Sequence, residues 1–170
     1  MTFLVDWQIR ELCKQALMIY PFNDDQVNPV SYDVRIGFNI ILEGEFGWRE
    51  ISIADKTKLD PYWLYPGECV LTETWEKFNL PYNICADFVL KSSRGREFYE
   101  HMKAGWCDPG WRNSVLTMEL KNNCQFHRLP LYPGLLIGQM IFSRLSEFPK
   151  KSYSETGRYN NDTKVKRSKG

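Results

Sequence analysis

Short runs of β-branched and aromatic residues, each followed by turn residues, recur along most of the chain and restrict its fold more than any other feature. Six of them occupy residues 32–42, 48–54, 68–74, 84–91, 114–120 and 135–142. Runs of this kind are typical of β-strands. Two Pro-Gly pairs, in the LYPG sequences that begin at Leu64 and Leu131, fit the central positions of type II turns. The pattern predicts a mainly β fold, either a sandwich or a distorted barrel.

Two segments have helical patterns instead. Near the N-terminus, apolar residues recur at helical spacing, which predicts one short amphipathic helix with an apolar face made of Val5, Ile9, Leu12, Cys13 and Ala16. The second segment, SSRGREFYEHM, predicts another short helix with Ser92 or Ser93 as its N-terminal cap. Gly95 is unfavourable inside that helix.

Length and composition favour one soluble domain. The 170 residues suffice for one full core, and no apolar run approaches the ~18 residues needed to cross a bilayer. The five cysteines are odd in number and lack CxxC spacing, which favours reduced thiols inside a cell. The first residues, MTFLVDWQIRELCK, lack the pattern of a secretory signal. We therefore expect a cytoplasmic protein.

The charge is unevenly distributed along the chain. The whole chain has a net charge of +1, whereas residues 149–170 contain seven basic and two acidic residues and thus carry +5. A basic segment attracts phosphate groups. A solvated, disordered end would have the same composition, and both interpretations are open at this point.

A carboxylate interrupts the strand pattern of residues 114–120. Because side chains on a strand alternate between its faces, Glu119 shares a face with Val115 and Thr117. If that face is enclosed, loss of water favours the protonated carboxyl group and suits the residue to taking up and returning protons. On the strand pattern alone, an exposed glutamate on a solvated face is the preferred interpretation.

Two further segments contain residue types that bind nucleotides. KSSRGR places Lys91, Arg94 and Arg96 beside two serines, and cations, hydroxyl groups and free backbone N–H groups together suit a triphosphate. A charged loop would have the same composition. In CDPGW, Asp108 is able to accept a ribose hydroxyl or to orient a water molecule, but aspartate is also an ordinary turn residue.

Several enzyme classes are excluded because their motifs are missing. A zinc-dependent nucleobase deaminase requires H-x-E followed by P-C-x-x-C. The two histidines of this chain lie in HMK (His101) and HRL (His127), so we expect no zinc. The sequence also lacks GxSxG, Walker A and dinucleotide-binding motifs.

Six motifs taken together resemble those of the dCTP deaminases, which are relatives of the trimeric dUTPases. They are NPVSYDVRIG, LYPGECVLTETWEKFNLP, KSSRGR, AGWCDPGW, LTMELKN and LYPGLLIGQMIF, and they occur in the family's order. The resemblance extends from LVDWQI near the N-terminus to about Tyr159. It implies a distorted, dUTPase-like β-barrel over residues 1–148, including the N-terminal helix, and a basic tail over residues 149–170 that is a candidate lid over the nucleotide. It further implies a homotrimer with sites between subunits, and neither nucleic acid nor a membrane as a partner.

The resemblance also implies a reaction and roles for individual residues. The reaction is hydrolytic deamination of dCTP to dUTP and ammonia, with Mg²⁺ bound only through the triphosphate. Glu119 would be the general base and acid, and Arg96 would orient the catalytic groups. Ser92 and the backbone carbonyl of Ala104 would hold the water. The residues implied at the nucleotide are Lys91, Ser92, Ser93, Arg94, Gly95 and Arg96 around the phosphates, Asp108 at the deoxyribose, Thr117 and Met118 at the pyrimidine edge, and Gln139, Tyr153, Arg158 and Asp162 at further contacts.

The chain departs from the family pattern at several points. Lys91 stands where arginine is usual and keeps the charge without the fork geometry. Asp162 puts a negative charge where the family has a neutral amide. One extra residue lies between Asp108 and Glu119, so a bulge must absorb it if Glu119 is to keep its face. Residues 97–103 are correspondingly one residue short. Such divergence would suit a viral member of the family acting in a host cell.

Three functions are compatible with these residues. The first is a dCTP deaminase, which in some members of the family also cleaves dUTP to dUMP and pyrophosphate. The second is a dUTPase-like diphosphatase in which Asp108 activates the water, although Glu119 has no role there and the glycine-rich tail motif of trimeric dUTPases is missing. The third is a non-catalytic regulator that binds nucleotide or protein. The presence of Glu119 favours the deaminase.

Overall fold

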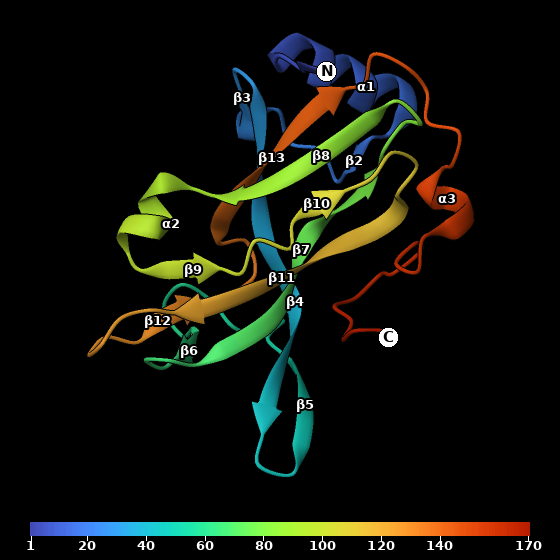
Figure 1. The fold of residues 1–170 in the computed structure, drawn as a ribbon. Helices are drawn as coiled ribbons and strands as arrows, with labels where there is room; N and C mark the ends of the chain where they lie inside the picture. The colour runs from blue at the N-terminus through green and yellow to red at the C-terminus, as the bar shows by residue number, and fades with distance from the viewer.

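The long strand β4 (Ser31–Gly44) organises the fold, because its two halves pair with different neighbours. The computed structural model describes residues 1–170, and Figure 1 shows β4 running through the middle of the molecule. The first half of β4 pairs with β13 (Leu136–Arg144), and the second half pairs with β7 (Cys69–Asn79). Both pairings are antiparallel. A strand shared in this way makes the sheet curl around one core.

The main sheet has the strand order β10-β8-β13-β4-β7-β11-β9 and forms a curled half-barrel (Figure 1). Its remaining central strands are β8 (Ile84–Leu90), β9 (Tyr99–His101), β10 (Trp106–Cys107) and β11 (Arg112–Asn122). Short strands extend it at β1 (Thr2–Phe3), β2 (Ile19–Tyr20), β3 (Val27–Asn28) and β5 (Gly47–Ser52), while β6 (Tyr62–Leu64) and β12 (Leu129–Leu131) form a separate pair. The predicted mainly β, distorted-barrel fold is therefore confirmed.

The core fills the space inside the curled sheet. It contains 30 buried residues, which come from nearly all of the strands and from the first helix. On β4, for example, Tyr32, Val34 and Ile36 are fully buried, as expected for alternate residues on one face. The apolar periodicity of the six sequence runs therefore corresponds to one common core.

The predicted N-terminal helix is confirmed as α1 (Asp6–Ala16). Ile9 and Cys13 are its buried residues and pack in the core. Leu17 follows the helix in the left-handed conformation with a φ of 48°, which ends it. A short 3₁₀ helix, η1 (Asp24–Gln26), follows β2.

The predicted helix over SSRGREFYEHM is wrong for its second half. Only α2 (Ser92–Arg96) is helical, and its N-cap is Lys91 rather than a serine. Phe98 then adopts a φ of +68°, and the chain continues as β9, which pairs with β11. Tyr99 is buried and donates a hydrogen bond from its hydroxyl group to the carbonyl of Pro130 at 2.6 Å. Strand pairing and burial thus override the local helical pattern.

The C-terminal tail packs against the barrel beside β11 (Figure 1). It contains one short helix, α3 (Tyr153–Thr156). Trp111 Nε1 donates a hydrogen bond to the Tyr159 carbonyl at 2.9 Å, and the Val115 amide donates one to the Asp162 carbonyl at 2.9 Å. No helix has the length and apolar character needed to cross a bilayer.

Candidate active site

A pocket of about 530 Å³ lies between β11, the segment around β10 and the C-terminal tail. Six residues that the sequence predicted for the site line it, namely Ala104, Asp108, Thr117, Glu119, Tyr153 and Asp162. Most of the other lining residues are hydrophobic, and they include Trp106, Trp111 and Tyr159. The pocket therefore combines an apolar wall with a few polar groups, which is typical of small-molecule sites.

Strand β11 contains a bulge upstream of Glu119. Arg112 pairs with Asn79 and Ser114 pairs with Phe78, so Asn113 is an extra residue on β11. Asn113 adopts a φ of 49°, a conformation that asparagine tolerates better than most residues. The bulge takes up one extra residue on β11, and a second register shift follows between Val115 and Thr117. Beyond both irregularities, Thr117 and Glu119 line the pocket.

The carboxylate of Glu119 is partly shielded and has an unusual neighbour. Its side chain is 25% exposed, and its Oε2 atom is buried without a hydrogen-bond partner. His101 Nε2, which is also buried and unpartnered, lies 3.5 Å from that oxygen. Glu119 is thus not the exposed glutamate that the strand pattern alone suggested.

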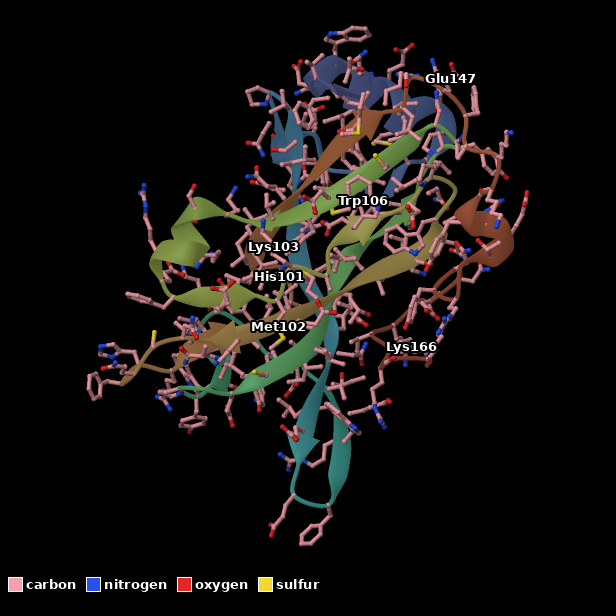
Figure 2. The ribbon with its side chains drawn as sticks, in the orientation of Figure 1. His101, Met102, Lys103, Trp106, Glu147 and Lys166 are labelled. Atoms are coloured by element: carbon pink, nitrogen blue, oxygen red, sulfur yellow. The ribbon has the colours of Figure 1, made fainter.

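His101 was not among the predicted site residues. Its isolated position in the sequence carries no signal of a role beyond the missing zinc motif. The residue reaches Glu119 because β9 pairs with β11, where His101 is the partner of Leu120. Figure 2 shows His101, Lys103 and Trp106 along the chain that leads from β9 to β10.

Asp108 lies at the mouth of the pocket in the predicted turn. Its carbonyl accepts a hydrogen bond from the Trp111 amide at 3.2 Å, and Gly110 adopts a φ of +85°. The carboxylate is exposed and accepts a hydrogen bond from Trp106 Nε1 at 3.0 Å. The side chain is therefore held by an indole rather than by its own backbone, and its outer face is free for a ligand.

The tail contributes both signs of charge to the pocket. Asp162 is held by Lys169, whose Nζ atom lies 2.9 and 2.7 Å from the two carboxylate oxygens. The negative charge that departs from the family pattern is thus paired within the tail. Lys166 and Arg167 also line the pocket, although the sequence singled out neither of them. Arg158 lies outside the lining, and its carbonyl accepts a hydrogen bond from Lys169.

Tyr153 is half-buried in the same wall. Burial raises the pKa of its hydroxyl group above the ordinary value of 10.0, with smaller contributions from neighbouring groups that include Asp108. The phenol therefore stays neutral near pH 7 and is able to donate a hydrogen bond.

The predicted phosphate-binding residues do not join this pocket within one chain. Ser92, Ser93, Gly95 and Arg96 are exposed on α2, and Figure 1 shows α2 on the opposite side of the molecule from the tail. The structure also places Lys91, Arg94 and Gln139 outside the lining.

Three of these residues already have partners in the chain. Lys91 forms an ion pair with Asp33, and Gln139 accepts a hydrogen bond from the Ser31 hydroxyl group at 2.7 Å. Arg94 forms an ion pair with Glu97. The side chains of Ser92, Ser93 and Arg96, in contrast, have no hydrogen-bond or ion-pair partner. Met118 is fully buried in the core, so only its backbone is near the pocket-lining face of β11.

The half-barrel is the fold of a class of dUTPase-like proteins. The 2'-deoxycytidine 5'-triphosphate deaminase of Agrobacterium tumefaciens superimposes with a TM-score of 0.68 at 20% identity, over 85% of this chain and 49% of that one. This chain thus spans about half the length of that protein. The dUTPase of EIAV superimposes with a TM-score of 0.51 at 14% identity, over 83% of this chain and 94% of the dUTPase.

Comparison of the amino-acid sequence identifies the family within this fold class. A family model described as DCD, dCTP deaminase-like, matches residues 3–145, and the chain belongs to that family. A curated relative from Mycobacterium marinum named "dCTP deaminase, dUMP-forming" is 34% identical over 86% of this chain and 82% of its own length. A relative of the same name from Streptomyces avermitilis is 36% identical over 92% of this chain and 88% of its own.

Proposed function

We propose that this protein catalyses the hydrolytic deamination of dCTP to dUTP and ammonia, with Glu119 as the proton shuttle. The observation that carries the proposal is the position of Glu119, whose carboxylate is partly shielded inside a pocket of about 530 Å³. A group in such a position is suited to repeated proton transfer. The relatives named dCTP deaminase, dUMP-forming, support the same reaction.

The reaction needs proton transfers that one carboxylate is able to perform in sequence. Glu119 takes a proton from water while the water oxygen bonds to C4 of the cytosine ring, and it passes this proton to ring nitrogen N3. The remaining hydroxyl proton then moves through Glu119 to the amino group, the C4–N bond breaks, and ammonia leaves. The backbone carbonyl of Ala104, which also lines the pocket, is the proposed acceptor that holds the water.

The complete site, in this proposal, forms between two subunits of a homotrimer. Ser92 and Arg96 are required to hold the water and to orient Glu119, yet they lie on α2, away from the pocket of their own chain. Their exposed side chains without partners are suited to entering the pocket of a neighbouring subunit. The phosphates of the substrate, carried as the Mg²⁺ complex, would meet this segment together with Lys166 and Arg167 from the tail.

Cleavage of dUTP to dUMP is the proposed second activity. Asp108 is exposed at the mouth of the same pocket, where its carboxylate is able to orient a second water molecule toward a phosphate. The words "dUMP-forming" in the names of the relatives favour this additional step. A diphosphatase that lacks deaminase activity and a non-catalytic regulator are the alternatives. The cytoplasmic location stays a prediction.

One assay separates these functions. The purified protein is given dCTP or dUTP with Mg²⁺, and ammonia and pyrophosphate are measured separately. We expect Glu119→Gln to lower ammonia release from dCTP by ~10²–10⁴-fold. We expect Asp108→Asn to lower pyrophosphate release from dUTP. Glu147→Gln is the matched control, because Glu147 is exposed and does not line the pocket. Figure 2 shows it apart from Trp106 and Lys166, which do.

The outcomes decide between the three functions. Pyrophosphate release from dUTP without any ammonia from dCTP would support the diphosphatase. No release of either product would support the regulator. Ammonia release at the wild-type rate from Glu119→Gln would refute the proposed mechanism.

A complementation experiment tests the shared site. Ser92→Ala and Glu119→Gln chains are each expected to be inactive alone, and they are then co-expressed. If each site takes Ser92 from one chain and Glu119 from its neighbour, random mixing leaves roughly a quarter of the sites intact, and ammonia release returns. If both residues act within one chain, every site stays damaged and the mixture stays inactive.

A further inference from the structure

Glu73, one of the buried carboxylates on β7, takes part in no ion pair. Only 3% of the residue is exposed. Glu76, three residues further along the strand, is also buried but forms an ion pair with Arg35 Nε at 2.7 Å. Because burial of an unpaired charge is costly, Glu73 depends on hydrogen-bond donors for its stability. The segments that supply these donors therefore indicate which parts of the fold Glu73 connects.

The donors to Glu73 come from two segments that are far apart in the sequence. Its Oε1 atom accepts hydrogen bonds from the Phe38 amide at 3.2 Å and from Asn39 Nδ2 at 2.7 Å, both on β4. Its Oε2 atom accepts the backbone amide of Val165, in the C-terminal tail. Val165 is itself buried, with 6% of the residue exposed. One carboxylate thus joins the barrel to the tail.

The barrel is shaped to hold this side chain. The pairing of β4 with β7 shifts register between Ile36 and Ile40, opposite Glu73, which frees the Phe38 amide from the ladder. A Cβ atom on Gly37 would lie 2.6 Å from Glu73 Cγ, so only glycine leaves room for the carboxylate there. The site of the tail contact is therefore built into the sheet.

We propose that Glu73 is a positioning residue that fixes the C-terminal tail over the pocket of its own chain. The residues that follow Val165 line that pocket, beginning with Lys166, whose amide donates a hydrogen bond to Thr117 Oγ1 at 3.3 Å. Arg167 lies next to it, with its guanidinium 4.8 Å from the centre of the Trp48 ring. Glu73 thereby holds two cations where a triphosphate would enter. This consequence for nucleotide binding rests on the proposed function, whereas the anchoring itself does not.

Hydrogen exchange of the Val165 amide tests the anchor directly in the full chain. The amide is expected to be protected in the wild type. In Glu73→Gln the exchange rate should rise by at least ~10-fold, because the neutral amide has one acceptor oxygen for donors on two sides. Amides of β8 should stay protected and so report that the barrel is folded. Glu147→Gln is the matched control and should leave the exchange of Val165 unchanged.

A measurement on the wild type decides the question even if Glu73→Gln fails to fold. The hydrogen bond predicts a scalar coupling in NMR spectra between the Val165 amide nitrogen and the side-chain carboxyl carbon of Glu73. An exposed, rapidly exchanging Val165 amide without this coupling would overturn the proposal. So would unchanged protection of Val165 in a folded Glu73→Gln variant.

Steady-state kinetics test the consequence for the substrate. If Glu73 acts through the tail, Glu73→Gln should raise KM for dCTP by ~10-fold and change kcat much less, because the lost interaction binds substrate and transition state alike. Val165→Ala keeps the backbone amide but removes apolar contacts of a buried tail residue, so it should also loosen the tail and raise KM. Combining the two changes should add little, because both act by releasing the same segment. If the effects of Glu73→Gln and Val165→Ala on KM were fully additive, the proposal that Glu73 acts through the tail would be overturned. A wild type that releases no ammonia would refute the proposed function, while the exchange of Val165 would still decide the anchor.

Discussion

Replacing His101 by phenylalanine should slow deamination without weakening substrate binding. Nδ1 of His101 accepts a hydrogen bond from the Lys103 amide at 3.3 Å, which leaves Nε2 as the ring nitrogen that is able to donate. Nε2 lies 3.5 Å from Glu119 Oε2, and neither atom has a hydrogen-bond partner. The ring also packs edge-on against Phe88 at a centroid distance of 4.7 Å, a contact that phenylalanine is able to keep. The variant therefore removes a donor while largely preserving the packing.

The expected size of the effect follows from this geometry. A hydrogen bond to a charged group is worth about 1.5–3 kcal/mol, which corresponds to ~10- to 150-fold in rate if it acts in the transition state. The distance of 3.5 Å is long for a hydrogen bond, and such contacts often shorten only when substrate is bound. We expect the lower end of this range, so kcat for ammonia release should fall ~10-fold with KM for dCTP nearly unchanged.

His101→Gln is the matched control, because the glutamine side chain is able to place an N–H donor near the position of Nε2. It should recover most of the kcat that His101→Phe loses. The assay is steady-state ammonia release from dCTP, with circular dichroism to show that both variants are folded. Equal kcat values for His101→Phe and the wild type would refute the reasoning, and so would a glutamine variant as slow as the phenylalanine variant.

The remaining predictions concern the bulge, the core and a buried thiol. Deletion of Asn113 should keep ammonia release within ~10-fold of the wild type, because this residue lies in the bulge and is not part of the strand pairing. A large loss of ammonia release would show that Asn113 is needed for the register of Glu119. Phe78→Ala should lower the free energy of unfolding by about 3–5 kcal/mol in urea titrations, since Phe78 is fully buried and stacks on Trp111 at 5.8 Å; a loss below about 1 kcal/mol would contradict the core assignment. Burial raises the pKa of the Cys13 thiol from 9.0 to about 12, so the thiol loses its proton at a lower pH in the unfolded chain than in the folded one. The stability contributed by the buried thiol is therefore complete below pH 9.0 and is lost as the pH rises toward 12. Unfolding titrations on both sides of pH 9.0 should show a smaller loss for Cys13→Ala than for the wild type, and identical losses would contradict this origin.

Local patterns were sufficient for most of the secondary structure. The six apolar runs became strands β4, β5, β7, β8, β11 and β13. All of these strands except the largely exposed β5 place alternate side chains in the common core. The helix α1 was equally clear from its spacing. The pattern failed after Arg96, where residues with a helical spacing pair with β11 instead. In that segment the free energy of pairing and of burying Tyr99 outweighs the local propensity.

The candidate site was predictable only in part. Alternation on β11 predicted that Thr117 and Glu119 share a face, and the extra residue before them predicted that a bulge was required. The pairing of Glu119 with His101 and the hydrogen bond of Glu73 to Val165 were not predictable, because each joins positions that no local pattern connects. Charge counting marked the tail as basic but did not distinguish Lys166, which lines the pocket, from Arg158, which does not.

By itself, the sequence determined the family, the kinds of structural element and the residue types available for chemistry, because these depend on short-range periodicity and on motifs read in order. The tertiary structure alone decided which of those residues meet. Strand pairing brought His101 to Glu119, and packing of the tail brought Lys166 to Thr117. The tertiary structure also left Ser92 and Arg96 on another surface of the chain. The physical reason is that such contacts depend on the register of strands and on the burial of surfaces formed by the whole chain, which neighbouring residues in the sequence do not specify.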